Sequence, residues 1–127
     1  MTGQDIYIMA SALLYERNNE DMDSKDFSIP FLNLLMQEAL PVENSIRFAK
    51  GEAQLDSAPY LTSLDETIAY SDEILRGALP YGLAARFFTE AMDNYNAAEC
   101  TARYVNALNS ATRFTEEPIT DIYGGAQ

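Results

Sequence analysis

The amino-acid sequence predicts an all-α fold: a bundle of four to five helices with a long inner loop and an extended C-terminal tail. Apolar residues recur every three or four positions in several separate segments, which is the spacing of one helix face. Capping residues, prolines and glycines stand where these segments begin and end. With 127 residues, of which 47% are hydrophobic, the chain can bury a modest core as one domain. We expect a helical domain over residues 1–114 and a docking tail over 115–127.

The N-terminal segment predicts a first amphipathic helix from Asp5 to Arg17. Thr2 and Asp5 have the spacing of a capping box at its start. The positions expected to be buried follow helical spacing: Ile6, Met9, Ala10, Leu13 and Leu14. Residues 18–26 contain two asparagines and four acids, and they predict a solvated loop.

A second helix is expected to begin near Ser28 and Pro30. Its apolar residues cover most of the helix circumference, which predicts a central position in the bundle. Pro41 is expected to end it. A third, shorter helix over 42–50 would then bury Val42, Ile46 and either Phe48 or Ala49, with Gly51 as its C-terminal cap.

The segment from Glu52 to Tyr70 shows no sustained helical period, and loops of this length in compact domains are often functional. Short β pairing between 60–61 and 68–70 is compatible with its residues. Six acids and no Lys or Arg lie between Glu52 and Glu73, so this is the most one-sided stretch in charge.

The C-terminal half predicts a helical hairpin. One helix runs from Ser71 to Glu90 with a kink near Arg76 and Gly77, because Pro80 removes a backbone donor inside it. The other runs over 94–113, and its expected buried face holds Tyr95, Ala98, Ala102, Val105 and Leu108 or Ala111. The turn between them is too short for any arrangement other than antiparallel packing.

Composition excludes several classes of function. The formal net charge of −12 argues against a surface that follows nucleic-acid phosphates. The chain has no His, so the usual near-neutral proton shuttle and the commonest metal ligand are missing. Its start lacks the basic region of a signal peptide and no apolar run approaches a membrane span, so we expect a soluble, unexported protein without membrane contact.

Three candidate chemical sites have simpler interpretations. Asn19, Asp21 and Asp23 resemble the first ligands of a calcium loop, but Ser24 and Pro30 stand where that loop needs Gly and Glu. Adjacent acid pairs diverge along the chain instead of sharing one site, and Cys100 sits beside Glu99, which would raise its thiol pKa. We expect no enzyme activity, no metal and no cofactor.

One pattern resembles a known family. The segments 72–75 (Asp-Glu-Ile-Leu), 78–85 (Ala-Leu-Pro-Tyr-Gly-Leu-Ala-Ala) and 103–108 (Arg-Tyr-Val-Asn-Ala-Leu) look like those of small head-tail connector, or adaptor, proteins of tailed bacteriophages. The resemblance covers roughly residues 31–123, including the Pro30-Phe31-Leu32 entry and Leu40-Pro41-Val42-Glu43-Asn44.

The resemblance implies an all-α virion subunit at the head–tail junction, assembled in the host cytoplasm. It implies a homo-oligomeric ring, commonly of twelve, beneath the portal protein and above a downstream neck or tail protein, through which double-stranded DNA passes without sequence-specific binding. The family's C-terminal segment commonly docks onto the portal. The matching residues, expected to contact the portal or a neighbouring subunit, are Pro118, Ile119, Ile122 and Tyr123.

Charge and tyrosine content suggest further expectations for such a ring. An acidic channel wall would repel DNA phosphates, and the expected wall residues are Asp65, Glu66, Asp72 and Glu73. Tyrosines are enriched where protein surfaces meet, and Tyr60 and Tyr104 are the expected interface residues. Two alternatives stay open: a small acidic DNA mimic that inhibits a nucleic-acid-binding enzyme, and a helical interaction protein without any nucleic-acid connection.

Overall fold

The computed structural model describes residues 1–15 and 24–125, with most side chains up to Thr112. This part of the chain holds five helices: α1 (Gly3–Tyr15), α2 (Ser24–Lys50), α3 (Asp72–Leu75), α4 (Leu79–Glu90) and α5 (Asn94–Gly125). The predicted all-α class is confirmed. In the described ranges the only β pairing is an isolated antiparallel bridge between Thr2 and Thr67, so pairing of 60–61 with 68–70 is wrong.

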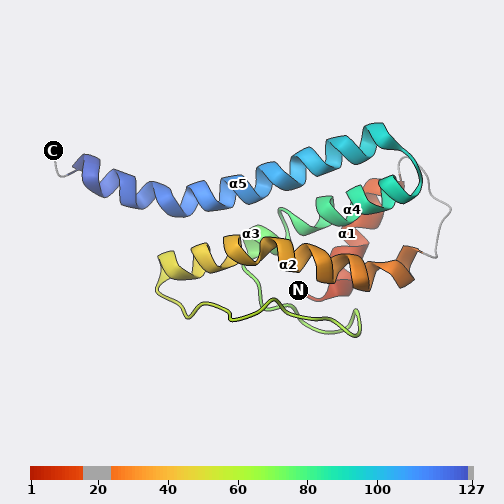
Figure 1. Ribbon diagram of the computed structural model, residues 1–127, viewed down its shortest axis with the longest axis horizontal. Coiled ribbons are helices and arrows are strands. Elements are labelled where there is room, and N and C mark those ends of the chain that lie inside the picture. The colour runs from red at the N-terminus through yellow and green to blue at the C-terminus, as the bar shows by residue number, and fades with distance from the viewer. Residues whose placement is uncertain (16–23, 126–127) are drawn as a thin grey trace.

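The helices are arranged around α4 (Figure 1). Helices α2 and α5 run in the same direction, and α4 runs back between them with α1 behind it. Helix α4 packs against α1, α2 and α5. Among the described helices, none is long and apolar enough to cross a membrane.

Helix α4, not the second helix, is the central element of the bundle. It is buried on nearly every side, through Leu79, Pro80, Gly82, Leu83, Ala84, Ala85, Phe87 and Phe88. A helix that is apolar all round is expected in the interior. Helix α2 instead keeps an outer face, on which Leu34 is 53% exposed and Phe48 is 70% exposed.

The capping box predicted at the start of the chain is confirmed. The Thr2 backbone N–H donates to Asp5 Oδ2 at 2.9 Å, and the Asp5 N–H donates to Thr2 Oγ1 at 3.2 Å. The Thr2 backbone N–H, and to a smaller extent the Thr2 hydroxyl, lower the pKa of the Asp5 carboxyl, because hydrogen-bond donors favour its charged form. Helix α1 therefore begins at Gly3, where a Cβ would stand 3.0 Å from side-chain carbons of Leu61 and Leu64.

Helix α2 is one continuous helix, so the predicted break at Pro41 is wrong. Its buried positions keep helical spacing across the proline: Leu32, Leu35, Met36, Ala39, Glu43 and Ile46. Pro30 and Pro41 both lie on the exposed side, where water can satisfy a carbonyl that loses its helical donor. Packing on one face therefore outweighs the missing bonds on the other.

Gly51 caps α2 as predicted. Its φ is +76°, a left-handed conformation that favours glycine. The Gly51 N–H donates to the Phe48 carbonyl at 3.1 Å, and the Glu52 N–H donates to the Arg47 carbonyl at 2.8 Å, which is a Schellman arrangement. The predicted burial of Ile46 is confirmed, whereas Phe48 and Ala49 are exposed.

The predicted kink between 71 and 90 is a complete break into α3 and α4. Helix α3 ends at Leu75, and Pro80 lies in the first turn of α4, where its missing N–H has no helical partner to lose. Gly77 permits the tight turn, because a Cβ there would stand 2.6 Å from the Glu73 carbonyl oxygen.

The predicted antiparallel hairpin of α4 and α5 is confirmed (Figure 1). The Asp93 N–H donates to the Phe88 carbonyl at 2.8 Å, which closes the turn. Asp93 also caps α5 by accepting from the backbone and side chain of Asn96 at 3.3 and 2.7 Å. Met92 adopts a left-handed φ of 60° between the two helices.

The buried face of α5 differs from the predicted one. Of the predicted residues Ala111 is buried, but Tyr95 is 76% exposed, Val105 is 44% exposed, and Ala98 and Ala102 are exposed. The other buried residues of the helix are Ala97, Cys100 and Tyr104. Alanines occur on both faces of this helix, so they define its phase poorly. Burying the large Tyr104 ring against Gly82, where a Cβ would stand 2.9 Å from Tyr104 Cδ1, decides the rotation.

Helix α5 continues through Gly125, so the expectation of an extended tail beginning at 115 is wrong. Residues added to an existing helix avoid the free-energy cost of nucleation, so each needs little additional stabilisation. One interior proline costs about 3 kcal/mol, and the rest of a 32-residue helix can offset it.

Candidate functional site

The acidic loop, residues 51–71, is attached to one side of α2. Two asparagines of α2 each form a pair of hydrogen bonds with one loop residue. Asn33 accepts from the Leu61 N–H at 2.7 Å and donates to its carbonyl at 3.1 Å. Asn44 does the same with Leu55, at 2.7 and 3.0 Å. Eleven residues separate the two asparagines, about three helical turns, so both lie on the same side of α2.

Both ends of the acidic loop meet at a buried ion pair. Glu43 is only 1% exposed, and its Oε2 accepts from Arg47 Nε at 2.7 Å. Glu43 Oε1 accepts from the Ser71 N–H at 2.8 Å, and Oε2 accepts from the Ser71 hydroxyl at 3.2 Å. Arg47 also donates to the carbonyls of Ala53 and Ala69, at 3.2 and 2.7 Å. A buried carboxylate needs this many partners to offset its lost hydration.

The middle of the loop is tied to the N-terminus and to itself. The Ile68 N–H donates to the Met1 carbonyl, and the Gln4 N–H donates to the Leu64 carbonyl, both at 2.9 Å. Glu66 accepts from the backbone N–H groups of Thr62 and Ser63, at 2.7 and 3.1 Å. These bonds hold the pKa of the Glu66 carboxyl below its usual value, because they favour the ionised form.

All six acids of the 52–73 segment are exposed, as the sequence predicts: Glu52, Asp56, Asp65, Glu66, Asp72 and Glu73. The expected channel-wall residues are therefore all on the outside of the subunit. Because the loop backbone is fixed to α2 and to the N-terminus, it presents these carboxylates on an ordered surface.

The two tyrosines expected at an interface lie in different environments. Tyr60 is 76% exposed and available to a partner. Tyr104 is only 7% exposed, and its hydroxyl donates to Glu38 Oε1 at 2.9 Å. Glu38 Oε2 also accepts from Arg86 at 3.1 Å. Tyr104 therefore joins α5 to α2 within the subunit, which corrects its assignment to a subunit interface.

The other predicted positions can be placed only in part. Pro118, Ile119, Ile122 and Tyr123 fall within α5, but their side chains lie outside the described ones. Asn19, Asp21 and Asp23 lie outside the described residues altogether. In the parts of the chain that the structure describes, no three His, Cys, Asp or Glu side chains are grouped to hold a metal. Cys100 is buried, consistent with a packing role.

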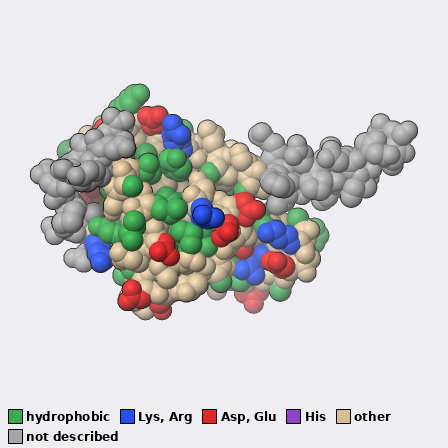
Figure 2. Space-filling view, turned by 180° about the vertical axis from the view of Figure 1, so that it is seen from behind, with side chains coloured by type: hydrophobic (Ala, Val, Ile, Leu, Met, Phe, Trp, Pro, Cys, Tyr) green, Lys and Arg blue, Asp and Glu red, His purple; other side chains and the backbone are tan. Residues whose placement is uncertain are grey.

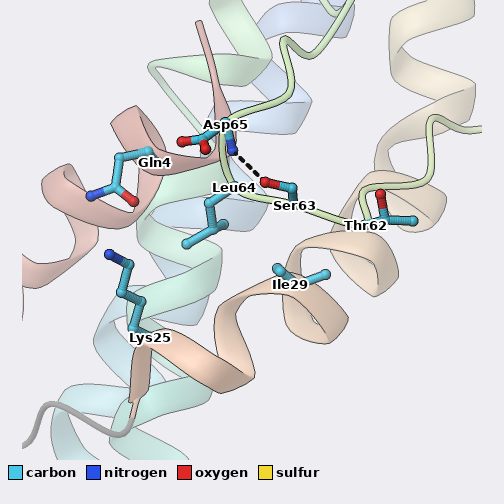
Figure 3. A pocket seen from close by; sticks show the side chains of 7 residues that line it. All are labelled: Gln4, Lys25, Ile29, Thr62, Ser63, Leu64 and Asp65. Carbon is cyan, nitrogen blue, oxygen red and sulfur yellow. Dashed lines mark hydrogen bonds between the residues drawn. The ribbon is translucent and has the colours of Figure 1, made fainter.

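A small open pocket lies where α1 and α2 begin, beside the acidic loop (Figure 3). Its volume is about 360 Å³, and it is lined by Gln4, Lys25, Ile29, Thr62, Ser63, Leu64 and Asp65. The Ser63 hydroxyl accepts from the Asp65 N–H at 3.2 Å, so it serves the turn of the loop. Among these seven residues we find no paired nucleophile and base.

Comparisons with known protein families, with curated proteins and with solved structures give no match.

Two buried tyrosines predict a loss of stability at alkaline pH. Burial, together with the Glu43 charge, raises the pKa of Tyr70, whose hydroxyl donates to the Met36 carbonyl at 2.6 Å. Burial and the bond to Glu38 raise the pKa of Tyr104. In the unfolded chain both groups ionise near pH 10, so above that value the unfolded state holds fewer protons than the folded state. The free energy of unfolding should be constant with respect to these groups below pH 10 and fall above it.

Urea denaturation between pH 8 and 11 measures this effect. Tyr70→Phe and Tyr104→Phe should each reduce the slope above pH 10, because phenylalanine cannot ionise. Tyr60→Phe, at an exposed position, is the matched control and should leave the slope unchanged. An equal change in all three variants would contradict the assignment to buried groups.

Proposed function

We propose that this chain is a structural virion protein that forms a ring between the portal and the tail of a bacteriophage and is part of the conduit for double-stranded DNA. The observation that best supports this is the 52–73 segment, whose six carboxylates are exposed and whose loop backbone is fixed at several points. An ordered anionic surface suits a wall along which DNA must slide.

Electrostatic repulsion between the 52–73 segment and DNA favours this function. Duplex DNA carries about one negative charge per 1.7 Å of axis, and proteins bind it mainly by neutralising phosphates with Lys and Arg. A wall with six acids and no base in the 52–73 segment would do the reverse in every subunit. Repeated around a ring, it would repel the duplex from all sides and keep it near the axis.

The proposed partners are the portal protein, neighbouring subunits and a downstream neck or tail protein. The residues proposed to contact the portal or a neighbouring subunit are Pro118, Ile119, Ile122 and Tyr123, now as part of a helix. The other face of the ring would receive a downstream neck or tail protein. The ring, proposed to hold twelve copies, would lie at the head–tail junction of the virion after assembly in the host cytoplasm.

A DNA mimic would share the acidic surface but not the assembly. It would act as a monomer or dimer and bind the basic cleft of a nucleic-acid-binding enzyme. Native mass measurement followed by negative-stain imaging, on the chain alone and after co-expression with the portal protein, separates the two proposals. A ring supports the connector. Because a connector can require the portal to assemble, the portal sample is the decisive one.

Replacing acids of the 52–73 segment by lysine should impair DNA passage without unfolding the subunit. Asp56→Lys, Asp65→Lys and Glu73→Lys change exposed positions, and each should alter the free energy of unfolding by less than about 0.5 kcal/mol. In assembled particles the triple variant should slow DNA ejection or leave DNA trapped, because a basic wall binds phosphate.

The control is a reversal of charge outside the loop. Glu90→Lys, at the exposed end of α4, adds positive charge without changing the proposed wall. It should leave the time course of ejection unaltered. If the triple variant assembles and ejects DNA at the unsubstituted rate, the 52–73 segment does not line the channel.

A further inference from the structure

The outer side of α2 carries a continuous uncharged stripe. Its members recur every three or four residues and are all exposed: Phe27, Pro30, Leu34, Gln37, Pro41, Ser45 and Phe48. Phe27 is 56% exposed, Leu34 53% and Phe48 70%. These positions lie opposite the buried residues of the same helix, so the α2 stripe points away from the core.

The α2 stripe is held at its N-terminal end by ring packing, and the part around Leu34 adjoins the anchored loop. Phe27 packs against Phe31 at a ring separation of 6.4 Å, and Phe31 packs edge-on against Phe87 of α4 at 5.8 Å. Asn33, the neighbour of Leu34 in sequence, holds Leu61 of the loop through two hydrogen bonds. The residue before Leu61 is Tyr60, which is 76% exposed. A partner would therefore meet a surface that is already ordered, which lowers the entropy lost on binding.

A second uncharged stripe lies on the outer side of α5. It consists of Tyr95, Ala98, Ala102, Val105 and Asn109, all exposed and also spaced by three or four residues. Its side chains are small at Ala98 and Ala102, which are neighbours on the helix surface, and larger at Tyr95 and Val105. This is the face that the sequence predicts to be buried.

Charge indicates which partner these stripes can accept. Charged residues make up 22% of the chain and are usually exposed in proteins, yet neither stripe contains one. Two copies of a chain with net charge −12 repel one another over most of their surfaces. Exposed Glu38 and Glu99 border the stripes, but they are paired with Arg86 and Arg103 at 3.1 and 3.6 Å. A second copy can therefore approach along the stripes with less repulsion between like charges than elsewhere on the surface.

Shape leads to the same pairing. The α2 stripe offers bulky side chains, and the α5 stripe offers small ones between larger residues, so the two stripes are complementary in side-chain size. In such a contact Leu34 would face Ala98 and Ala102. We propose, on the basis of the ring function above, that the α2 stripe of one subunit packs on the α5 stripe of its neighbour. A contact between two different surfaces repeats around an axis, so it can close into a ring.

Cysteine cross-linking tests the pairing directly in chains co-expressed with the portal protein. Cys100→Ala removes the native thiol, and Leu34→Cys with Ala102→Cys places one new thiol on each stripe. A short bismaleimide should link neighbouring subunits into a ladder of multimers. Thr101→Cys in place of Ala102→Cys is the matched control, because Thr101 is exposed on the adjacent side of the same helix. It should reduce the cross-linked fraction at least tenfold.

A charge pair tests the same contact by assembly. Leu34→Glu and Ala102→Glu should each abolish subunit association, whereas Leu34→Glu combined with Ala102→Lys should restore it. Rings on the portal without the 34–102 cross-link would overturn this pairing while leaving the ring function intact. The cross-link without portal binding would support the pairing and count against the connector function. Neither ring nor cross-link would overturn both.

Discussion

Glu43→Ala is expected to lower the free energy of unfolding by about 2–4 kcal/mol and to release both ends of the acidic loop. The carboxylate is almost fully buried, and it accepts three hydrogen bonds from Arg47 and Ser71. Its removal leaves the Ser71 N–H and part of the Arg47 charge without their acceptor. Urea denaturation measures the stability, and amide hydrogen exchange of residues 52–71 measures the release of the loop.

Two variants make the Glu43 experiment specific. Glu43→Gln keeps the volume but loses the charge, and it should retain part of the stability. Glu52→Ala, an exposed acid of the same loop, should change stability by less than about 0.5 kcal/mol. If Glu43→Ala and Glu52→Ala had equally small effects, the buried ion pair would not anchor the loop.

Deleting residues 117–127 is expected to abolish association with the portal or the neighbouring subunit while leaving the melting temperature of the subunit unchanged. The last residue of the described core is Ala111, and the hydroxyl of Thr112 bonds back to the Leu108 carbonyl. The deletion begins beyond both, so the described packing stays intact. A helix with a hydrophobic pattern can instead bind in a groove of a partner.

Point substitutions test which side chains of the deleted segment are needed for association. Ile119→Ala and Tyr123→Ala should each weaken portal association, and Thr120→Ala on the same helix should not. Size-exclusion chromatography with co-expressed portal and thermal denaturation of the isolated subunit provide the two readouts. A large fall in melting temperature, with association retained at lower temperature, would mean that this segment stabilises its own subunit.

Local signals in the sequence correctly predict the ends of several elements. Thr2 with Asp5, and Gly51 after α2, each act through one or two hydrogen bonds to nearby backbone. Such bonds depend on a few adjacent residues, so single-sequence patterns reveal them. The α4–α5 hairpin is predictable for the same reason, because a short turn leaves little choice of geometry.

Features that depend on tertiary packing, such as the continuity of α2 and the rotation of α5, are predicted poorly from the sequence. Pro41 is a helix breaker in isolation, but here it lies opposite a core face that continues through Glu43 and Ile46. The rotation of α5 depends on the contacts of Tyr104, which packs against Gly82 and donates a hydrogen bond to Glu38. Both residues are far from Tyr104 in sequence. Neither partner can be recognised from the periodicity of the helix itself.

The acidic surface could be predicted from charge alone, but its anchors could not. The anchors lie on a helix in which most positions are apolar, so its few polar residues show no recognisable pattern. They are Asn33, Asn44 and the Glu43–Arg47 pair. The spacing of Glu43 and Arg47, four residues apart on a helix, is a signal for an ion pair. Nothing in the sequence indicates that this pair is buried by its contacts with Ala69 and Ser71, which lie 22 and 28 residues farther along the chain than Arg47 and Glu43.

Electron microscopy of the chain co-expressed with the portal protein tests the central claim most directly. The connector function predicts a ring of this protein on the portal, coaxial with its channel, with the 52–73 segment facing the lumen. The contrary result is a portal without bound chain, with the protein recovered as a monomer or dimer.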